Sequence, residues 1–342
     1  MKTWYGIDLF KFIAAILIVF LHTYNSDWGA AGDWVRQVLS TACVPFFFLS
    51  SGFLFRRGLE KSREKGGDLG EKAWFKHYLT RLLKMYLVWT LLTLPVAFLI
   101  VNRGHPDYGT AMKVLYHFRL FLLTGSIGFY WYILALILSV VVIYWFHRKG
   151  LDAFLLAISF LLFIWGCFYN SPLNHRQPYF EILHIVFGSE RSFLNVGLFY
   201  VLIGFLIPKQ YPAREAGFWR WAILSFFIAA IVIRTLEVCF LRMNFTTVLV
   251  AVGAFAVALC FDFTRLAAVS LELRKLSVGI YLLHCPFILS FDFYLRRGTL
   301  VDFPVTLAFC FVAYYSVTRI APQLSPLLFG YPGRLTTVRK ET

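Results

Sequence analysis

Three ionisable side chains stand in the first strongly apolar stretch of the chain: Asp8, Lys11 and His22. An ionisable residue inside a membrane helix costs about 2.5–3.5 kcal/mol on insertion scales, so each one is a functional candidate. On a helix, Lys11 and His22 share one face about 16 Å apart, with Asp8 one turn before Lys11. The stripe predicts a polar path facing the interior of a helical bundle. An Asp8–Lys11 ion pair at one membrane interface, with His22 reaching the other interface, would satisfy the same spacing.

A second candidate surface is made of small residues in the next apolar stretch. Ser50, Ser51 and Gly52 follow Pro45, which has no backbone N–H and therefore frees a carbonyl one turn earlier. Such a surface lets a thin ligand or another helix come close. The residues alone do not separate these two alternatives.

The composition defines the environment that must hold these side chains. Of 342 residues, 59% are hydrophobic and 15% are charged, whereas soluble domains average about 45–50% and about 25%. The chain is therefore predicted to be an integral membrane protein and not a soluble or disordered one. Its net charge of +15 does not indicate nucleic-acid binding, because long apolar stretches separate the basic residues.

The apolar stretches predict an all-α fold of about ten transmembrane helices. They fall at 6–24, 38–55, 79–101, 127–147, 151–168, 194–208, 219–238, 246–262, 277–295 and 304–320. The stretches are continuously apolar and do not alternate, which excludes a β-barrel. The segment 114–123 reads as an interfacial or re-entrant helix, so nine to eleven spans fit the pattern. We expect one transmembrane domain over residues 1–330 and a short basic cytoplasmic tail over 331–342.

The distribution of Lys and Arg predicts the orientation. With the N-terminus inside, the inside segments carry about twice as many Lys and Arg residues as the outside segments, which favours an even number of spans and two cytoplasmic termini. The segment 56–76 is then a highly charged cytoplasmic loop. Residues 12–21 are expected to remain as a signal anchor in the cell membrane, the bacterial cytoplasmic membrane being the expected one.

Other polar residues are expected to be structural. Arg234 and Glu237 stand three positions apart in the seventh span, where a mutually satisfied pair is favoured over an acceptor site. The six cysteines lack metal-ligand spacing, so we expect no disulfide framework, no metal and no tightly bound cofactor.

Several segments, in order along nearly the whole chain, resemble the acyltransferase-3 family of ten-span membrane acyltransferases. Lys11 to His22 matches a basic-x10-His pattern, 45–55 matches P-x-F-F-x-x-S-G-F, and 277–284 matches S-x-G-I-Y-L-x-H. Further matching features are Arg81 with Lys84, Trp131 and 204–206. The chain departs from the pattern where Lys11 replaces the common Arg and where Lys84 makes the third-span pair mixed. Lysine lacks the bidentate fork that arginine offers to phosphate.

The resemblance implies transfer of an acyl group, acetyl being the expected one, from cytoplasmic acyl-CoA as co-substrate. The acceptor would be a hydroxyl of an extracytoplasmic or lipid-linked carbohydrate of the cell envelope. Cations at an inner mouth would bind the phosphates of coenzyme A, with Lys11 deeper. These cations are Arg56, Arg57, Arg81 and Lys84.

His22 suits the role of general base, because the imidazole pKa of about 6.5 allows proton transfer near neutral pH. An acyl-His intermediate is the open alternative. Ser50, Ser51 and Trp131 are candidate donors to the oxyanion, and His284 is a candidate supporting residue.

Two rival functions remain open. The resemblance extends to the membrane domain of membrane-bound serine racemases, especially at 6–12 and 43–55, which would imply amino-acid transport. A scaffold protein is the third reading, disfavoured by the buried cations and His22. Partners beyond the bilayer, the acyl donor and the acceptor would be a second copy of the chain or an envelope-biosynthesis protein.

Overall fold

The computed structural model describes residues 4–104, 107, 109–123, 130–169, 193–207, 217–241, 244–261, 263–294 and 299–330. The secondary structure of these residues is helical, without strands, which confirms the all-α class. The expected tail 331–342 lies outside the described residues. The division into a membrane domain and a tail therefore remains a prediction.

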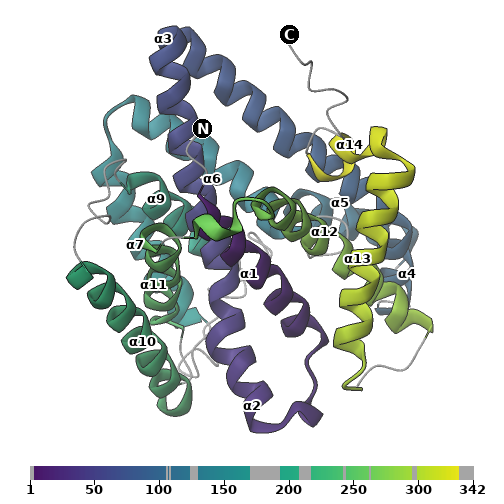
Figure 1. The fold of residues 1–342 in the computed structure, drawn as a ribbon. Coiled ribbons are helices and arrows are strands. Elements are labelled where there is room, and N and C mark those ends of the chain that lie inside the picture. The colour runs from purple at the N-terminus through teal and green to yellow at the C-terminus, as the bar shows by residue number, and fades with distance from the viewer. Residues whose placement is uncertain are drawn as a thin grey trace, which may run out of the picture.

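Each predicted span lies largely within a helix, and the helices pack into one bundle (Figure 1). They are α1 (Tyr5–Thr23), α2 (Gly29–Trp34), α3 (Cys43–Leu92), α4 (Leu94–Gly104), α5 (Thr110–Leu123), α6 (Trp131–Arg148), α7 (Asp152–Tyr169), α9 (Leu198–Leu206), α10 (Gly217–Phe240), α11 (Thr247–Cys260), α12 (Ser270–Tyr294), α13 (Asp302–Ile320) and α14 (Ser325–Phe329). Short helical turns η2 (Val35–Leu39) and η3 (Ser40–Ala42) lead into α3, and η5 (Phe193–Gly197) leads into α9.

Five helical segments among the described residues are long and apolar enough to cross a membrane. They are Tyr5–Thr23, Ser26–Leu92, Trp131–Arg148, Gly217–Phe240 and Asp302–Ile320. Shorter apolar helices cover Asp152–Phe168, Phe193–Leu206 and Thr247–Cys260. The chain is thus built as a multi-pass membrane protein, while the count of ten spans and the orientation remain predictions.

The expected charged loop at 56–76 is instead helical, and this prediction was wrong. Helix α3 continues through the segment as two arms that meet at Gly66 and Gly67, and Figure 1 shows these arms projecting beyond the bundle. Gly67 has φ 58°, a value that glycine adopts without a steric penalty. The charged residues between the spans are good helix formers, and pairs such as Lys72–Asp68 (2.6 Å) stabilise successive turns.

Asp68 also joins this hairpin to α6, because its carboxylate accepts a hydrogen bond from Arg148. The hydrogen bonds from Arg148 and Lys72 hold the pKa of Asp68, which lies outside the predicted spans, at about 2. A depressed carboxyl pKa contributes stability above its ordinary value and loses that contribution as the pH falls. The contact is therefore fully formed at neutral pH and weakens only from about pH 4 downward.

Helices α1, α3 and α12 form the centre that positions the candidate site. Trp4 packs edge-on against Phe53 (5.2 Å between ring centroids) and Phe10 stacks on Phe46 (5.8 Å), so α1 and α3 run antiparallel. The start of α1 therefore lies toward the Gly66–Gly67 turn. We call this end of the bundle the hairpin end. The opposite end, at which α1 terminates, is called the cavity end.

Gly52 lies in a helix crossing and not beside an open ligand path. A Cβ atom built on Gly52 would stand 1.9 Å from the Val201 carbonyl oxygen, and one on Gly204 would stand 1.9 Å from that of Leu49. The two glycines thus let α3 and α9 pack backbone to backbone. The sequence left open whether Gly52 lies against a thin ligand or against another helix. In the structure it lies against another helix, α9.

Candidate functional site

His22 faces a second histidine on α12 at the cavity end. The ring centroids of His22 and His284 are 5.4 Å apart, and His284 is 1% exposed. Nδ1 of His284 lies 3.0 Å from the Ile280 carbonyl oxygen, which only accepts, so Nδ1 carries a proton. Nε2 lies 2.8 Å from Cys285 Sγ. Sequence reasoning ranked His284 as supporting, and the structure brings its imidazole beside the candidate base.

Helix α12 contains a proline just after His284. Pro286 has no N–H for the carbonyl of Leu282, four residues earlier. The hydroxyl of Tyr130, at the start of α6, donates to that carbonyl at 3.5 Å. This hydrogen bond ties α12 to α6 beside the histidine pair.

Asp8 pairs with Arg274 at the hairpin end of the same two helices. Both carboxylate oxygens lie 2.8 Å from guanidinium nitrogens of Arg274, and Ser270 Oγ donates to Asp8 at 2.5 Å. Asp8 is 2% exposed. Since Asp8 meets Arg274 and His22 meets His284, α1 and α12 run parallel. The sequence does not indicate this pairing, because the two residues are 266 positions apart along the chain.

Lys11 lies half-buried between these two contacts. It is within electrostatic reach of Asp8, Arg274 and Arg81. The predicted stripe Asp8–Lys11–His22 therefore follows the α1–α12 interface, with the Asp8–Arg274 ion pair at one end and the histidine pair at the other. The sequence also allowed an ion pair between Asp8 and Lys11. In the structure Asp8 instead forms a bidentate ion pair with Arg274.

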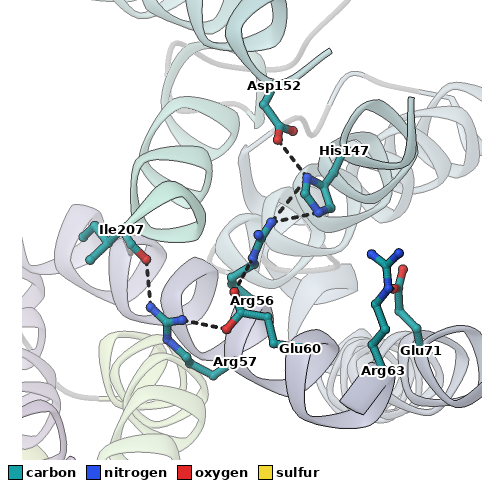
Figure 2. Close-up of polar contacts among 8 residues, drawn as sticks. All are labelled: Arg56, Arg57, Glu60, Arg63, Glu71, His147, Asp152 and Ile207. Carbon is teal, nitrogen blue, oxygen red and sulfur yellow. Dashed lines mark hydrogen bonds and ion pairs between the residues drawn. The ribbon is translucent and has the colours of Figure 1, made fainter. Parts of the chain in front are cut away.

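Arg56 and Arg57 belong to a network of side chains at the hairpin end (Figure 2). Glu60 accepts from Arg56 Nε at 2.8 Å and from an Arg57 terminal nitrogen at 2.7 Å. Arg57 also donates to the Ile207 carbonyl at 2.8 Å, and Arg56 lies 2.8 Å from Nε2 of His147. Both predicted phosphate ligands thus hold α3 to its neighbouring segments.

His147 lies between Arg56 and Asp152. Nε2 of its imidazole is 2.8 Å from a terminal nitrogen of Arg56, and Nδ1 is 2.8 Å from Asp152 Oδ2. The imidazole therefore links Arg56 to Asp152, as Figure 2 shows. The sequence does not indicate a partner for His147, because Arg56 lies 91 positions away along the chain.

Arg81 and Lys84 present a different surface from this network. Both side chains are exposed, and the Arg81 guanidinium lies 5.3 Å from the Tyr78 ring centroid. The five predicted phosphate-binding cations therefore differ in environment. Arg56 and Arg57 are paired with Glu60, whereas Arg81 and Lys84 are exposed. Lys11 is half-buried, within electrostatic reach of Arg81 and Arg274.

The candidate oxyanion donors are largely engaged. Ser50 Oγ donates to the Phe47 carbonyl at 3.0 Å inside its own helix, and Ser51 Oγ lies 3.1 Å from Tyr132 Oη. Trp131 packs against Phe48 (6.0 Å between ring centroids) and lines a cavity.

This cavity has a volume of about 130 Å³ and lies between α1, η3, α3, α6, α7, η5, α9 and α11. Leu21, the residue before His22, lines it together with Pro45 and Trp131. Sequence reasoning missed the cavity, since its wall comes from elements spread over more than 200 residues.

Arg234 and Glu237 form the ion pair that their spacing predicts, at 2.6 Å, and both are buried. Arg234 also donates to the Gln37 carbonyl at 3.0 Å and to Asn244 Oδ1 at 2.7 Å. Glu237 accepts from the backbone N–H of Phe245 at 2.7 Å. The pair therefore ties α10 to η2 and to the start of α11, and it holds Asn244 at the cavity wall.

The described residues contain no group of three or more His, Cys, Asp or Glu side chains that could hold a metal ion. All six cysteines are free thiols.

Comparisons with known proteins agree with this architecture. The model of the Acyl_transf_3 family, described as an acyltransferase domain, matches residues 4–319. A serine/alanine racemase from Enterococcus gallinarum is 24% identical over 230 residues, covering 61% of this chain and 30% of that protein. An amino-acid racemase from Enterococcus faecalis is 28% identical over 228 residues, covering 64% of this chain and 30% of that protein.

The chain thus spans about 30% of the length of these curated relatives. No solved structure matches the chain. Because the family model covers nearly all of the helical bundle, including the histidine pair and both ends of α1, the chain belongs to the Acyl_transf_3 family of acyltransferase-like membrane proteins.

Proposed function

We propose that this protein transfers an acyl group, expected to be acetyl, from cytoplasmic acyl-CoA to a hydroxyl of a carbohydrate or other cell-envelope acceptor. The observation that carries the proposal is the histidine pair inside an acyltransferase domain that spans nearly the whole chain. A proton acceptor at this position would lie in the bundle, at the opposite end from the cationic surface.

The donor would enter at the hairpin end, taken as cytoplasmic. Arg81 and Lys84 are exposed there and free to meet phosphate in a way that the paired Arg56 and Arg57 are not. Half-buried Lys11 extends the positive potential along the α1–α12 interface. An extended pantetheine arm that follows this interface would carry the thioester toward His22.

In the chemical step, His22 accepts the proton of the acceptor hydroxyl as the oxygen attacks the thioester carbonyl. The C–O bond forms, the C–S bond breaks, and the coenzyme A thiolate leaves and takes the proton from His22. His284, oriented by its bond to the Ile280 carbonyl, would hold the His22 ring in place. In the rival version His22 itself becomes acylated and passes the acyl group on.

Binding of the donor is the first test. Acetyl-CoA should bind to the purified protein in nanodiscs by calorimetry, and Arg81→Ala with Lys84→Ala should weaken binding by about tenfold or more, because both phosphate contacts are lost. Lys72→Ala, another exposed cation of α3, is the matched control and should bind normally. A protein that binds no acyl-CoA would contradict the proposal.

His22→Ala tests the base. It should abolish transfer of radiolabelled acetyl groups to envelope material while folded yield and acetyl-CoA binding stay normal, because only the proton acceptor is removed. His117→Ala removes a buried histidine of α5 and should retain activity. An active His22→Ala protein would refute the role of His22. Retention of label on the wild-type protein after denaturation would favour the acyl-His version.

Amino-acid transport is the second candidate, favoured by the racemase names of the relatives. It predicts that proteoliposomes accumulate serine with no acyl donor present. Accumulation that survives Arg81→Ala and Lys84→Ala would favour transport over acyl transfer.

A further inference from the structure

The cavity beside Leu21 has a wall made largely of hydrocarbon. Its lining includes the apolar side chains of Leu21, Val44, Pro45, Phe163 and Val196. Among the described residues that line it none is acidic or basic. A phosphate, a carboxylate or an ammonium group buried there would lack a partner of opposite charge, which is strongly unfavourable. The cavity therefore suits an uncharged, apolar group.

Several polar atoms of the lining residues are engaged or buried away from the space. The hydroxyl oxygens of Ser40 and Thr247 are buried within the protein and do not face the cavity. Thr41 Oγ1 donates to a backbone carbonyl one turn earlier at 2.8 Å, and Asn244 Oδ1 accepts from Arg234 at 2.7 Å. The contacts that these residues offer to an occupant are therefore mostly apolar.

The volume of the cavity limits the size of its occupant. The cavity measures about 130 Å³. This value is close to that of an apolar cavity that holds one benzene molecule, about 150 Å³. A lipid tail or a pantetheine arm is too large for such a space, and the methyl of an acetyl group would leave most of it empty. A hydrocarbon chain of about four to six carbons fits.

The cavity lies next to the histidine pair along two helices. Leu21 lines the cavity, and His22 follows it in α1. Trp131 lines it as well, and the preceding residue, Tyr130, donates to a backbone carbonyl of α12. Consecutive Cα atoms are about 3.8 Å apart, and an extended chain of six carbons is about 6 Å long. An acyl chain whose thioester lies at His22 is therefore long enough to reach the cavity.

We propose that this cavity holds the hydrocarbon end of the donor's acyl group. The inference rests on the proposed function, because it takes the donor to be an acyl-CoA whose thioester lies at His22. The family resemblance implies acetyl, whereas the cavity indicates an acyl group of about four to six carbons. Each methylene that moves from water into an apolar site strengthens binding about fourfold. Butyryl-CoA and hexanoyl-CoA are therefore better donors for this protein than acetyl-CoA.

The test measures binding of acyl-CoA to the whole chain in nanodiscs by calorimetry, with empty nanodiscs as the reference for partition into lipid. The probes are acetyl-CoA, butyryl-CoA, hexanoyl-CoA and octanoyl-CoA. Butyryl-CoA should bind about tenfold more tightly than acetyl-CoA, and hexanoyl-CoA at least as tightly as butyryl-CoA. Octanoyl-CoA should gain nothing further, because its chain exceeds the volume of the cavity.

Two substitutions in the wall should shift this preference in opposite directions. Val44→Phe fills the space and should remove the advantage of hexanoyl-CoA over acetyl-CoA, while acetyl-CoA still binds. Phe163→Leu enlarges the space and should let octanoyl-CoA bind more tightly than hexanoyl-CoA. Val232→Phe is the matched control on α10, because Val232 is 53% exposed and does not line the cavity. It should leave the preference unchanged.

Equal binding of acetyl-CoA and the longer donors to the wild-type protein would overturn the inference. An advantage of the longer donors that neither Val44→Phe nor Phe163→Leu alters would also overturn it. If acetyl-CoA binds and chain length has no effect, only this inference fails and the proposed function stands. If no acyl-CoA of any length binds, the proposed donor is wrong and the acyl pocket fails with it.

Discussion

At the scale of single residues, chemistry depends on which side chains meet. His22 and Asp8 are recognisable in the sequence because ionisable groups are rare in apolar stretches. Their partners His284 and Arg274 are more than 250 positions away, and only packing brings them together. The Arg234–Glu237 pair is the opposite case, since helical spacing alone predicts it.

This buried pair gives a prediction about stability. Arg234→Met leaves the carboxylate of Glu237 buried without its partner and should destabilise the fold by about 3–5 kcal/mol, measured by thermal unfolding in detergent. The double variant Arg234→Met with Glu237→Leu should recover much of that loss. Lys72→Ala breaks an exposed pair with Asp68 and should cost at most about 1 kcal/mol. Equal effects of Arg234→Met and Lys72→Ala would contradict this account.

At the scale of elements, helix α3 is the clearest departure from the sequence-based prediction. The charge-rich segment 56–76 lacks the apolar character of a span, which predicted a loop. Charged residues are compatible with a helix in water, and the hairpin is fastened by Arg148 of α6 and by Trp74, which packs over Gly58 of the opposite arm. Hydropathy reports membrane burial and does not distinguish a solvated helix from a loop.

The crossing of α3 and α9 gives an element-scale prediction. Gly52→Ala would place a methyl group against the backbone of Val201, which cannot move aside without separating the helices. The yield of folded protein by size-exclusion chromatography should fall sharply. Gly66→Ala is the matched control on the same helix, because no atom lies within 4 Å of its added Cβ. A normal yield of Gly52→Ala would show that the crossing tolerates a wider separation.

At the scale of the whole molecule, α1 and α12 run parallel, so the two helices point in the same direction through the bundle. The excess of inside cations further predicts that the hairpin end faces the cytoplasm. Everything proposed for the donor depends on this orientation.

Cysteine labelling can measure the orientation. With the exposed Cys239 replaced by Ser, Gly66→Cys at the hairpin should react with an impermeant maleimide only in inside-out vesicles. Asp27→Cys, exposed beyond the end of α1, should react in intact cells. The reverse pattern would invert the topology and remove the proposed route for acyl-CoA.

The sequence by itself determined the membrane class, the apolar helices, the polar stripe on α1 and the resemblance to one family. These properties are local, since hydropathy and helical periodicity are set by neighbouring residues. Tertiary structure alone decided that Asp8 pairs with Arg274, that His22 faces His284, and that Leu21 and Trp131 line one cavity. Such contacts depend on how whole helices pack, and the spacing of residues along one helix carries no information about the partner on another.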